Sequence, residues 1–322
     1  MLLLLAALGG VPSLAAAQAA KIKLGTSLSP PSSDALTSYV AVERGFFGKY
    51  GLDVQVIAFR GGAINMKALL AGEVDVSVIG ATDCIVSASE GAKIRLWLVP
   101  YPMLPFHLVA RREAASTLQG LAGKHIAVSG IGTISYHVPR IVFQRSGMDP
   151  EDVKYIAVGS PADRFKALLA GKVDATLVSN TEAAKLAKYP EIIDLAQVSK
   201  VVPEIPYEFG VAKEDYIERN PETISKLTKA LLEASRWIAA NRAGTVEVGT
   251  KILKEESPEV LGRAYDLAGP RHWGVNGDIS EAAYNYTVDF LTKVGYLKDP
   301  VPFEKFFDRR FVDRALKELG RL

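Results

Sequence analysis

The sequence predicts an α/β protein made of two similar lobes, each a mostly parallel sheet flanked by helices. Two observations support this prediction: one stretch of the chain recurs at an offset of 99 positions, and each copy alternates buried strand patterns with a helical pattern. The chain also has 322 residues, more than the roughly 250 at which a single hydrophobic core stops growing. We therefore expect two domains built on one plan.

Composition and charge exclude several classes of protein. Apolar residues make up 48% of the chain and charged residues 23%, as in an ordinary globular protein. The 38 basic and 36 acidic residues are interspersed and leave a net charge of +2, so no basic stripe is present to bind nucleic acid. Cys84 is the only cysteine, which excludes an internal disulfide and a cysteine-built metal site. We expect Cys84 to be a small buried residue, and we expect no metal and no cofactor.

Residues 1–20 have the character of a signal peptide. An apolar run over 2–5, extended by Leu8, precedes Ala17-Gln18-Ala19, which matches the small-x-small pattern of a cleavage site. No later stretch has the roughly 18 uninterrupted apolar residues of a membrane helix, and no cysteine follows the signal to accept a lipid. The mature protein is therefore predicted to be soluble and exported.

The repeat defines the central part of each lobe. Residues 54–83 align without gaps on 153–182, and the hexapeptide KALLAG occurs at both 67–72 and 166–171. Each copy has the pattern of a strand, a short helix and a second strand, with the glycine of the hexapeptide placed to cap the helix. Such units form parallel sheets.

A further strand and helix precede each copy, so each lobe is expected to follow a βαβαβ order. The predicted elements of the first lobe are strands over 22–26, 54–59 and 74–79 with helices over 35–44 and 63–71, and the second lobe adds a strand over 124–129 and a helix over 133–145 before its copy of the repeat.

The C-terminal part of the chain is predicted to be helical. Asn220-Pro221-Glu222 and Ser257-Pro258-Glu259 each place a capping residue before a proline at the first helical position, with an acid in the first turn. Further helices are expected after 278–280 and over 310–319. Because this stretch is too helical for a third equivalent lobe, we expect it to pack on the first lobe.

The run AVERGFFGKYGLDV over 41–54 is similar to the pattern A-x-E-x-G-F-F-x-K-x-G-L-D-V of the nitrate/sulfonate/taurine-type substrate-binding proteins of ABC importers. That family also includes binding proteins for pyrimidine precursors of thiamine. Two further stretches match: 118–128 resembles the family's entry into the second lobe, and 132–137 resembles its Gly-Ser/Thr-x-Ser-x-His loop. Physically, the first run is a helix stopped by Gly45, aromatic residues turned into the core, and a turn at Gly51.

The resemblance implies a type II periplasmic binding protein fold, in which two lobes are joined by a two-strand hinge. It implies a discontinuous first lobe over 21–107 and 206–322 and a second lobe over 108–205. The hinge strands would lie near 106–110 and 207–212.

In open parallel sheets the ligand crevice lies beyond the carboxyl ends of the strands, where helix N-termini converge. The repeat locates those ends twice. They are expected at 27–29, 60–62 and 80–83 in the first lobe, and at 129–136, 159–162 and 179–182 in the second.

The loop over 130–135 has the pattern of an anion site. Gly130 and Gly132 allow close backbone approach, while Thr133 and Ser135 add hydroxyls at a helix N-terminus, which suits a carboxylate, a sulfonate or a similar anion. The alternative is that Gly132 and Thr133 only start and cap the helix. The pattern Gly-x-Gly-x-x-Gly is not completed here, so a dinucleotide site is disfavoured.

Several candidate side chains have both a functional and a structural interpretation. Arg60 can pair with an anion or stand in solvent. His137 can contact the ligand or line the face between the lobes. Trp97, Tyr101 and Tyr207 flank the crossovers and can stack on a flat ligand or belong to the core.

Polar residues recur at the strand ends of both copies, which suits a site closed from two sides, although the acids Asp83 and Glu182 can equally cap helices. The candidate ligand-binding residues are Ser27, Leu28, Arg60, Gly61, Gly62, Thr82, Asp83, Tyr101 and Tyr207 in the first lobe and hinge, and Ser129, Gly132, Thr133, Ser135, Tyr136, His137, Ser160, Asn180, Thr181 and Glu182 in the second.

These patterns favour a monomeric periplasmic protein that captures a small solute, most simply an organic anion, by hinge closure and catalyses nothing. Its partners would be the permease and ATPase subunits of an ABC importer. One alternative is an enzyme on the same fold, similar to a thiamine-pyrimidine synthase; the fungal type has a cysteine cluster, and a single cysteine does not supply one. An exported ligand-sensing domain is another alternative, with the same sequence pattern.

Overall fold

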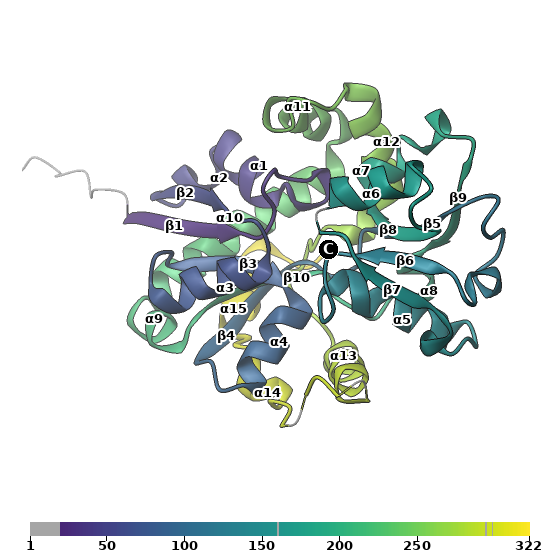
Figure 1. Ribbon diagram of the computed structural model, residues 1–322. Coiled ribbons are helices and arrows are strands. Elements are labelled where there is room, and N and C mark those ends of the chain that lie inside the picture. Colours follow the sequence, from purple (N-terminus) through teal and green to yellow (C-terminus); the bar gives the residue numbers. More distant parts are fainter. Residues whose placement is uncertain (1–19, 160, 294, 298) are drawn as a thin grey trace, which may run out of the picture.

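The computed structural model describes residues 20–322 except 160, 294 and 298. It contains two five-stranded sheets, each covered by helices, which lie beside one another (Figure 1). We call the half built around the first sheet lobe one and the half built around the second sheet lobe two. The predicted signal peptide, apart from Ala20, and the candidate Ser160 lie outside the described residues. In the part that is described, no helix combines the length and apolar character needed to cross a bilayer.

The first sheet has the strand order β2-β1-β3-β10-β4, and the second has the order β7-β6-β8-β5-β9. In each sheet the first three strands of that order are parallel, and the fourth runs antiparallel to both of its neighbours. The strands are β1 (Ala20–Thr26), β2 (Leu52–Ala58), β3 (Val76–Gly80), β4 (Ile94–Tyr101), β5 (Phe106–Arg111), β6 (His125–Val128), β7 (Lys154–Ala157), β8 (Ala175–Ser179), β9 (Ile192–Gln197) and β10 (Glu208–Lys213).

The prediction of two lobes on one plan is confirmed. The repeated segments form β2, α3 (Gly62–Ala71) and β3 in lobe one, and β7, α6 (Pro161–Leu169) and β8 in lobe two. The repeated aspartate makes the same hydrogen bond in both lobes. Asp75 Oδ2 accepts a 2.7 Å bond from Lys23 N, and Asp174 Oδ2 accepts a 2.9 Å bond from His125 N. This carboxylate ties the second repeat strand to the first strand of its lobe.

The chain crosses between the sheets twice. It leaves β4 at Tyr101 and enters the second sheet with β5 at Phe106, and it returns to the first sheet with β10 at Glu208. Each crossing strand occupies the fourth place in the sheet that it enters. The two connections lie at the hinge strands that the family resemblance implies near 106–110 and 207–212.

The predicted helices form in the predicted order, together with further helices that the sequence analysis did not predict. The helix expected over 35–44 is preceded by a separate 3-10 turn, η1 (Ser33–Ala35), because the Ser32 side chain accepts a bond from Asp34 N and starts a turn of its own. The other α-helices are α1 (Thr37–Glu43), α2 (Phe46–Lys49), α4 (Ala81–Ser89), α5 (Ile134–Arg145), α7 (Asn180–Ala183), α8 (Val198–Val201), α9 (Glu214–Arg219), α10 (Pro221–Ala240), α11 (Arg242–Ile252), α12 (Pro258–Ala268), α13 (Glu281–Lys293), α14 (Phe303–Phe306) and α15 (Arg310–Leu319).

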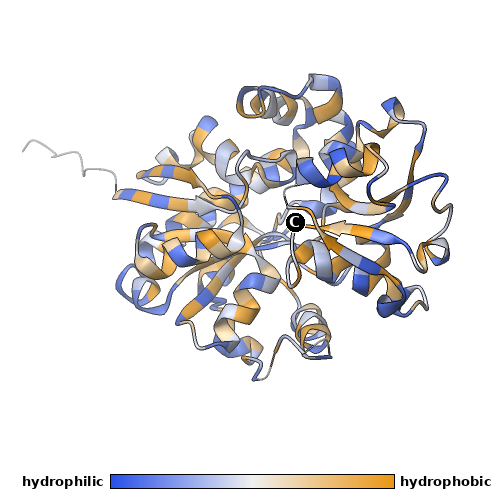
Figure 2. Cartoon of the chain, viewed as in Figure 1, coloured by the Kyte–Doolittle hydropathy of each residue, from blue (hydrophilic) through white to orange (hydrophobic). Residues whose placement is uncertain are grey.

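The C-terminal helices pack on lobe one, as expected, but they also reach lobe two. Helix α10 packs against α1, α2 and α15, whereas α12 packs against α7 of lobe two. Hydrophobic residues are concentrated along the strands of both sheets (Figure 2). The largest fully buried side chains include Trp97 and Trp273, so Trp97 belongs to the core rather than to a ligand surface.

Candidate functional site

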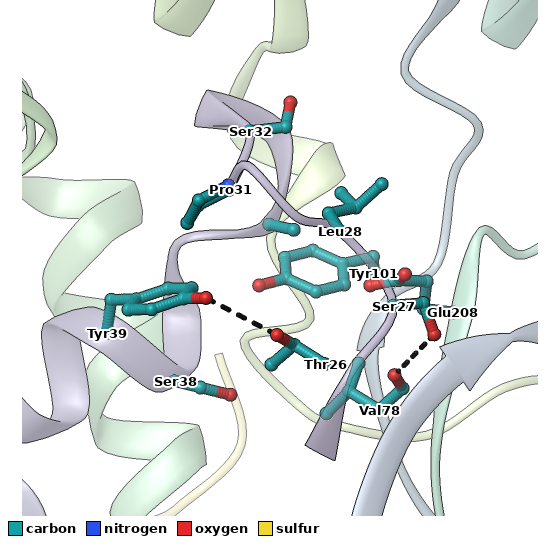
Figure 3. A pocket seen from close by; sticks show the side chains of 11 residues that line it. Thr26, Ser27, Leu28, Pro31, Ser32, Ser38, Tyr39, Val78, Tyr101 and Glu208 are labelled. Atoms are coloured by element: carbon teal, nitrogen blue, oxygen red, sulfur yellow. Dashed lines mark hydrogen bonds between the residues drawn. The ribbon is translucent and has the colours of Figure 1, made fainter. Parts of the chain in front are cut away.

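A pocket opens at the carboxyl end of β1, where the sequence predicts one side of the crevice. Its empty space, including the open solvent at its mouth, is about 260 Å³. Figure 3 shows its side chains. The lining residues are Thr26, Ser27, Leu28, Pro31, Ser32, Ala35, Ser38, Tyr39, Val78, Tyr101 and Glu208.

Three of the predicted residues, Ser27, Leu28 and Tyr101, line this pocket. Ser27 Oγ donates to the Val78 carbonyl at 3.1 Å. The Tyr101 hydroxyl accepts a 2.9 Å bond from Thr37 N, at the start of α1. Both hydroxyls are therefore oriented by the scaffold at the edge of the pocket.

Glu208 is the acid of the pocket. Its side chain is drawn beside Ser27 and Tyr101 in Figure 3, and the residue is 3% exposed. Burial raises the pKa of its carboxyl to about 8, and the nearby Asp83 carboxyl raises it further. Among the residues that the structure describes, its carboxyl has no hydrogen-bond or ion-pair partner. Sequence reasoning missed this residue, although an acid at the start of an apolar crossover strand was a signal.

The repeat produces matched hydrogen-bond networks beneath the strand ends of the two lobes. In lobe one, Asn65 Nδ2 donates to Ser27 Oγ at 3.2 Å and to the Val78 carbonyl at 3.1 Å, and Asn65 Oδ1 accepts from Ser77 at 2.9 Å. Asn65 is fully buried.

Arg164 occupies the equivalent position in lobe two, 99 residues later. Its guanidinium donates to the Ser129 hydroxyl, the Gly159 carbonyl, the Thr176 hydroxyl and the Leu177 carbonyl. Three of these partners are the repeat equivalents of the Asn65 partners. Burial lowers the pKa of Arg164 to about 10. The sequence alignment paired Asn65 with Arg164 but gave no sign that both organise the strand ends.

The predicted anion loop of lobe two is held by its own side chains. Ser135 Oγ accepts from Ser129 N at 2.8 Å and lies 2.8 Å from Thr133 Oγ1, which donates to the Gly130 carbonyl at 2.7 Å. Thr133 is the N-cap residue of α5, without a side-chain cap bond. The backbone of Thr133 therefore starts helix α5, as in the alternative interpretation, while its hydroxyl bonds to other residues of the loop.

His137 and Tyr136 lie on α5 against other side chains. His137 Nε2 donates to the Gly132 carbonyl at 3.0 Å, and its ring packs on Tyr296 with the ring centres 4.2 Å apart. Burial lowers the pKa of His137 to about 4. Tyr136 packs on Tyr155 and Arg140. Ligand contact by either residue stays a prediction.

Asn180 and Thr181 meet lobe one directly. Asn180 Nδ2 donates to Asp34 Oδ1 at 2.7 Å, and Thr181 Oγ1 lies 2.6 Å from Ser33 Oγ. All four residues are buried. Burial raises the pKa of Asp34 to about 7, although its bond to Asn180 acts in the opposite direction.

This interlobe contact continues into the second sheet. Asn180 Oδ1 lies 3.0 Å from His107 Nε2, and His107 Nδ1 lies 2.6 Å from Asp194 Oδ2. Because Asn180 uses its amide nitrogen on Asp34, its oxygen accepts a hydrogen bond from His107 Nε2–H. A line of hydrogen bonds therefore runs from Asp194 through His107 and Asn180 to Asp34, from one lobe to the other.

The remaining predicted residues lie around the pocket and the hinge. Arg60 is exposed and does not line the pocket, so anion pairing by Arg60 stays a prediction. Gly61 is the residue before α3, which Gly62 begins. A Cβ at Gly62 would lie 2.0 Å from Asp83 Oδ2, so the Asp83 carboxyl lies directly against this glycine.

Thr82 is buried beside Asp83 in the first turn of α4. Glu182 accepts from Ser179 N at 3.0 Å and forms a capping box at α7, which is the structural role considered for it. Tyr207 packs its ring against Tyr101 and Phe106 at the crossover.

In the described residues, no group of three or more His, Cys, Asp or Glu side chains is arranged to hold a metal ion. The features that stand out are instead a compact pocket, a buried acid and a polar contact between two similar lobes. A family model described as NMT1/THI5 like matches residues 32–243, more than half of the chain. The chain belongs to the NMT1/THI5-like family.

Relatives and solved structures agree with this membership. YtlA of Bacillus subtilis (strain 168) is 24% identical over 296 residues, which cover 87% of this chain and 86% of YtlA. The taurine-binding periplasmic protein of Escherichia coli (strain K12) is 25% identical over 198 residues, 61% of each chain. The alkanesulfonate-binding protein SsuA from Xanthomonas axonopodis pv. citri, bound to MOPS, superposes with a TM-score of 0.76 at 19% identity, over 91% of this chain and 100% of its own.

These findings confirm the resemblance seen in the run over 41–54 and the predicted fold. In that run Gly45 and Gly51 have φ angles of 72° and 70° and Phe47 is buried, so it acts through the fold rather than through chemistry. The superposition with SsuA shows that the two proteins share the fold described above, two sheets joined by two crossing strands.

Proposed function

We propose that this protein is the solute-binding component of an ABC importer, exported to the periplasm and monomeric, and that it captures a small organic solute between its lobes by hinge closure. Lobe one comprises 21–107 and 206–322, and lobe two comprises 108–205. The closed form would dock on a membrane permease driven by an ATPase. The protein catalyses no reaction in this proposal.

The observation that supports hinge closure best is the buried polar contact between the lobes. Asp34 and Asn180 are each about 1% exposed and bond to one another across the interface. Polar groups lose their water in such a contact, so it is favourable only while both partners are paired. An open form would return both groups to water, and the two crossing strands supply the pivot for that motion.

Further contacts between the lobes lie at the periphery. Lys185 pairs with Glu256, and Gln197 Nε2 donates to the Leu267 carbonyl at 2.9 Å. Arg145 Nε donates to the Tyr286 hydroxyl at 2.7 Å. A contact surface made of separate polar bonds can open and close with little loss of core, and relative motion of domains is the usual behaviour of such interfaces.

The position of the pocket supports a binding role. It lies at a carboxyl strand end, as ligand crevices of open α/β sheets do. The predicted anion loop over 129–137 would contribute from lobe two, so that a solute touching both lobes stabilises the closed state by its differential contacts. The relatives named for taurine and alkanesulfonate are binding proteins of this kind.

Small-angle scattering combined with a thermal-shift screen tests the proposal. The screen would use taurine, ethanesulfonate, small carboxylates, nitrate and pyrimidines, because a compound that binds only the native state raises the melting temperature by mass action. We expect at least one compound to raise the melting temperature and to reduce the radius of gyration. Binding without contraction would contradict hinge closure, and turnover of the bound compound would contradict a purely binding role.

A further inference from the structure

We infer that Glu208 selects the solute by pairing with a cationic nitrogen group, so that the solute is a small zwitterion or cation rather than a simple anion. This inference rests on the proposed function, because it assigns a chemical group to one end of the captured solute. It goes beyond the organic anion that the sequence favours, and it concerns the lobe-one end of the site.

The Glu208 carboxyl belongs to the lining of the pocket. Glu208 is the first residue of β10, the strand that returns the chain to lobe one, and its side chain lines the pocket with Ser27 and Tyr101 (Figure 3). The residue is 3% exposed. A carboxyl so placed is fixed by the strand and faces the space that a solute would fill.

The Glu208 carboxyl has no hydrogen-bond or ion-pair partner in the part of the chain that the structure describes. Buried carboxylates are normally paired, because an unpaired buried charge is costly. The pocket therefore contains an acceptor that the protein leaves free, and a ligand group is the natural partner.

The pocket around Glu208 has no basic side chain, because its lining includes no Lys, Arg or His. The titratable groups that interact electrostatically with Glu208 are all acids, namely Tyr39, Asp83, Cys84, Tyr101 and Tyr207. The lining offers no basic side chain to an anionic group, whereas a protonated amine would meet the Glu208 carboxyl and the hydroxyls of Thr26 and Ser38.

Binding of a cation beside Glu208 would be coupled to the release of a proton from its carboxyl. Burial raises the pKa of the Glu208 carboxyl to about 8 in the free protein, so the group is mostly protonated at neutral pH. A bound cation favours the carboxylate and expels this proton. Affinity for an amine-bearing solute should therefore rise with pH, by up to about tenfold per pH unit, until pH 8 is reached, while the amine itself stays charged.

Matched pairs of compounds test the inference. The pairs are taurine with ethanesulfonate, β-alanine with propionate, and 4-aminobutyrate with butyrate, which differ only in the terminal amine. Affinities would be measured by calorimetry at pH 6, 7 and 8 for the wild type, Glu208→Gln and the control Glu214→Gln. Glu214 is a suitable control because it lies at the start of α9, beyond the far end of β10, and pairs with Arg95.

We expect the amine member of at least one pair to bind at least tenfold more tightly than its partner. This preference should disappear in Glu208→Gln and persist in Glu214→Gln. The melting temperature of Glu208→Gln at pH 8 should equal or exceed that of the wild type, because the amide avoids burial of a charge, and this measurement shows that the variant is folded.

Two other results would overturn the inference in different ways. If amine-free members bind as tightly as their partners, or if the preference survives Glu208→Gln, the solute-binding role stands and the role of Glu208 falls. If no member of any pair binds and no compound of the wider screen contracts the protein, both the proposed function and the inference about Glu208 are wrong.

Discussion

Asn180 Nδ2 donates a 2.7 Å hydrogen bond to Asp34 Oδ1, and this bond joins two residues that are 146 positions apart in the chain and belong to different lobes. The same amide accepts from His107. One buried side chain thus bonds both to an acid of lobe one and to His107 on strand β5 of the second sheet. Removing it leaves both groups without their partner in the closed form.

Asn180→Ala should shift the free protein toward its open form. An unsatisfied buried polar group costs roughly 1–3 kcal/mol, and this cost applies to the closed state because an open form returns Asp34 to water. A bias of this size changes an equilibrium about 5- to 150-fold. We expect a larger radius of gyration in small-angle scattering. Asn276→Ala is the control, since its amide donates to the Leu322 carbonyl within lobe one, and equal scattering from both variants would contradict a role for the interlobe bond.

Glu208→Gln should remove a pH dependence of stability. The folded-state pKa of about 8 lies above the ordinary value near 4.5, so the native state binds more protons than the unfolded state between these values. The free energy of unfolding of the wild type therefore decreases as pH rises through this window. From pH 6.5 to 8 the loss from this group should be about 1–2 kcal/mol.

The pH range from 6.5 to 8 distinguishes Glu208 from the other groups with shifted pKa values. The raised pKa values of Asp83 and Asp34, about 6 and about 7, also lower the free energy of unfolding as pH rises, but at lower pH. The pKa values of His137 and His272 are lowered to about 4, so these groups affect the free energy of unfolding only below about pH 6.5. Urea unfolding at several pH values would measure the slope. A slope that is the same in Glu208→Gln as in the wild type would show that the carboxyl is ionised when folded.

Arg164→Met should destabilise lobe two strongly. The buried guanidinium bonds to Ser129 after β6, to Gly159 after β7 and to Leu177 within β8, and Met removes these bonds. We expect a loss of about 2–4 kcal/mol in the free energy of unfolding. Arg219→Met is the matched control, because Arg219 pairs with Asp215 on the exposed face of α9, and its loss should stay below about 0.5 kcal/mol. Similar losses in the two variants would rule out an organising role for Arg164.

Gly62→Ala should strain the start of α3. A methyl group there would lie 2.0 Å from Asp83 Oδ2 and 3.4 Å from the Ile79 side chain, so the carboxyl must move. We expect a loss of about 1–2 kcal/mol in thermal or urea unfolding. Gly48→Ala is the control, because its added methyl group meets nothing within 4 Å.

A second substitution identifies the cause of that strain. Asp83→Ala in the Gly62→Ala background should recover most of the lost stability, since residues in contact show non-additive effects. Additive losses in the double variant would place the strain elsewhere.

The sequence alone determined the fold class and the location of the strand ends. Its repeat placed β2, α3 and β3 in register with β7, α6 and β8. These features follow from local periodicity, which records whether a segment is buried and on which face. Ser27, Leu28 and Tyr101 were predicted at the strand ends, and they line the pocket.

Only the tertiary structure decided which polar groups meet. Arg60 stands in solvent, Asn180 and Thr181 join the lobes, and Glu208 faces the pocket without a partner. The physical reason is that the interlobe partners of Asn180 and Thr181 and the pocket around Glu208 come from segments more than 100 positions away in the chain. A side chain's local pattern states its burial but not its distant partner, and the folded arrangement of the two lobes supplies that partner.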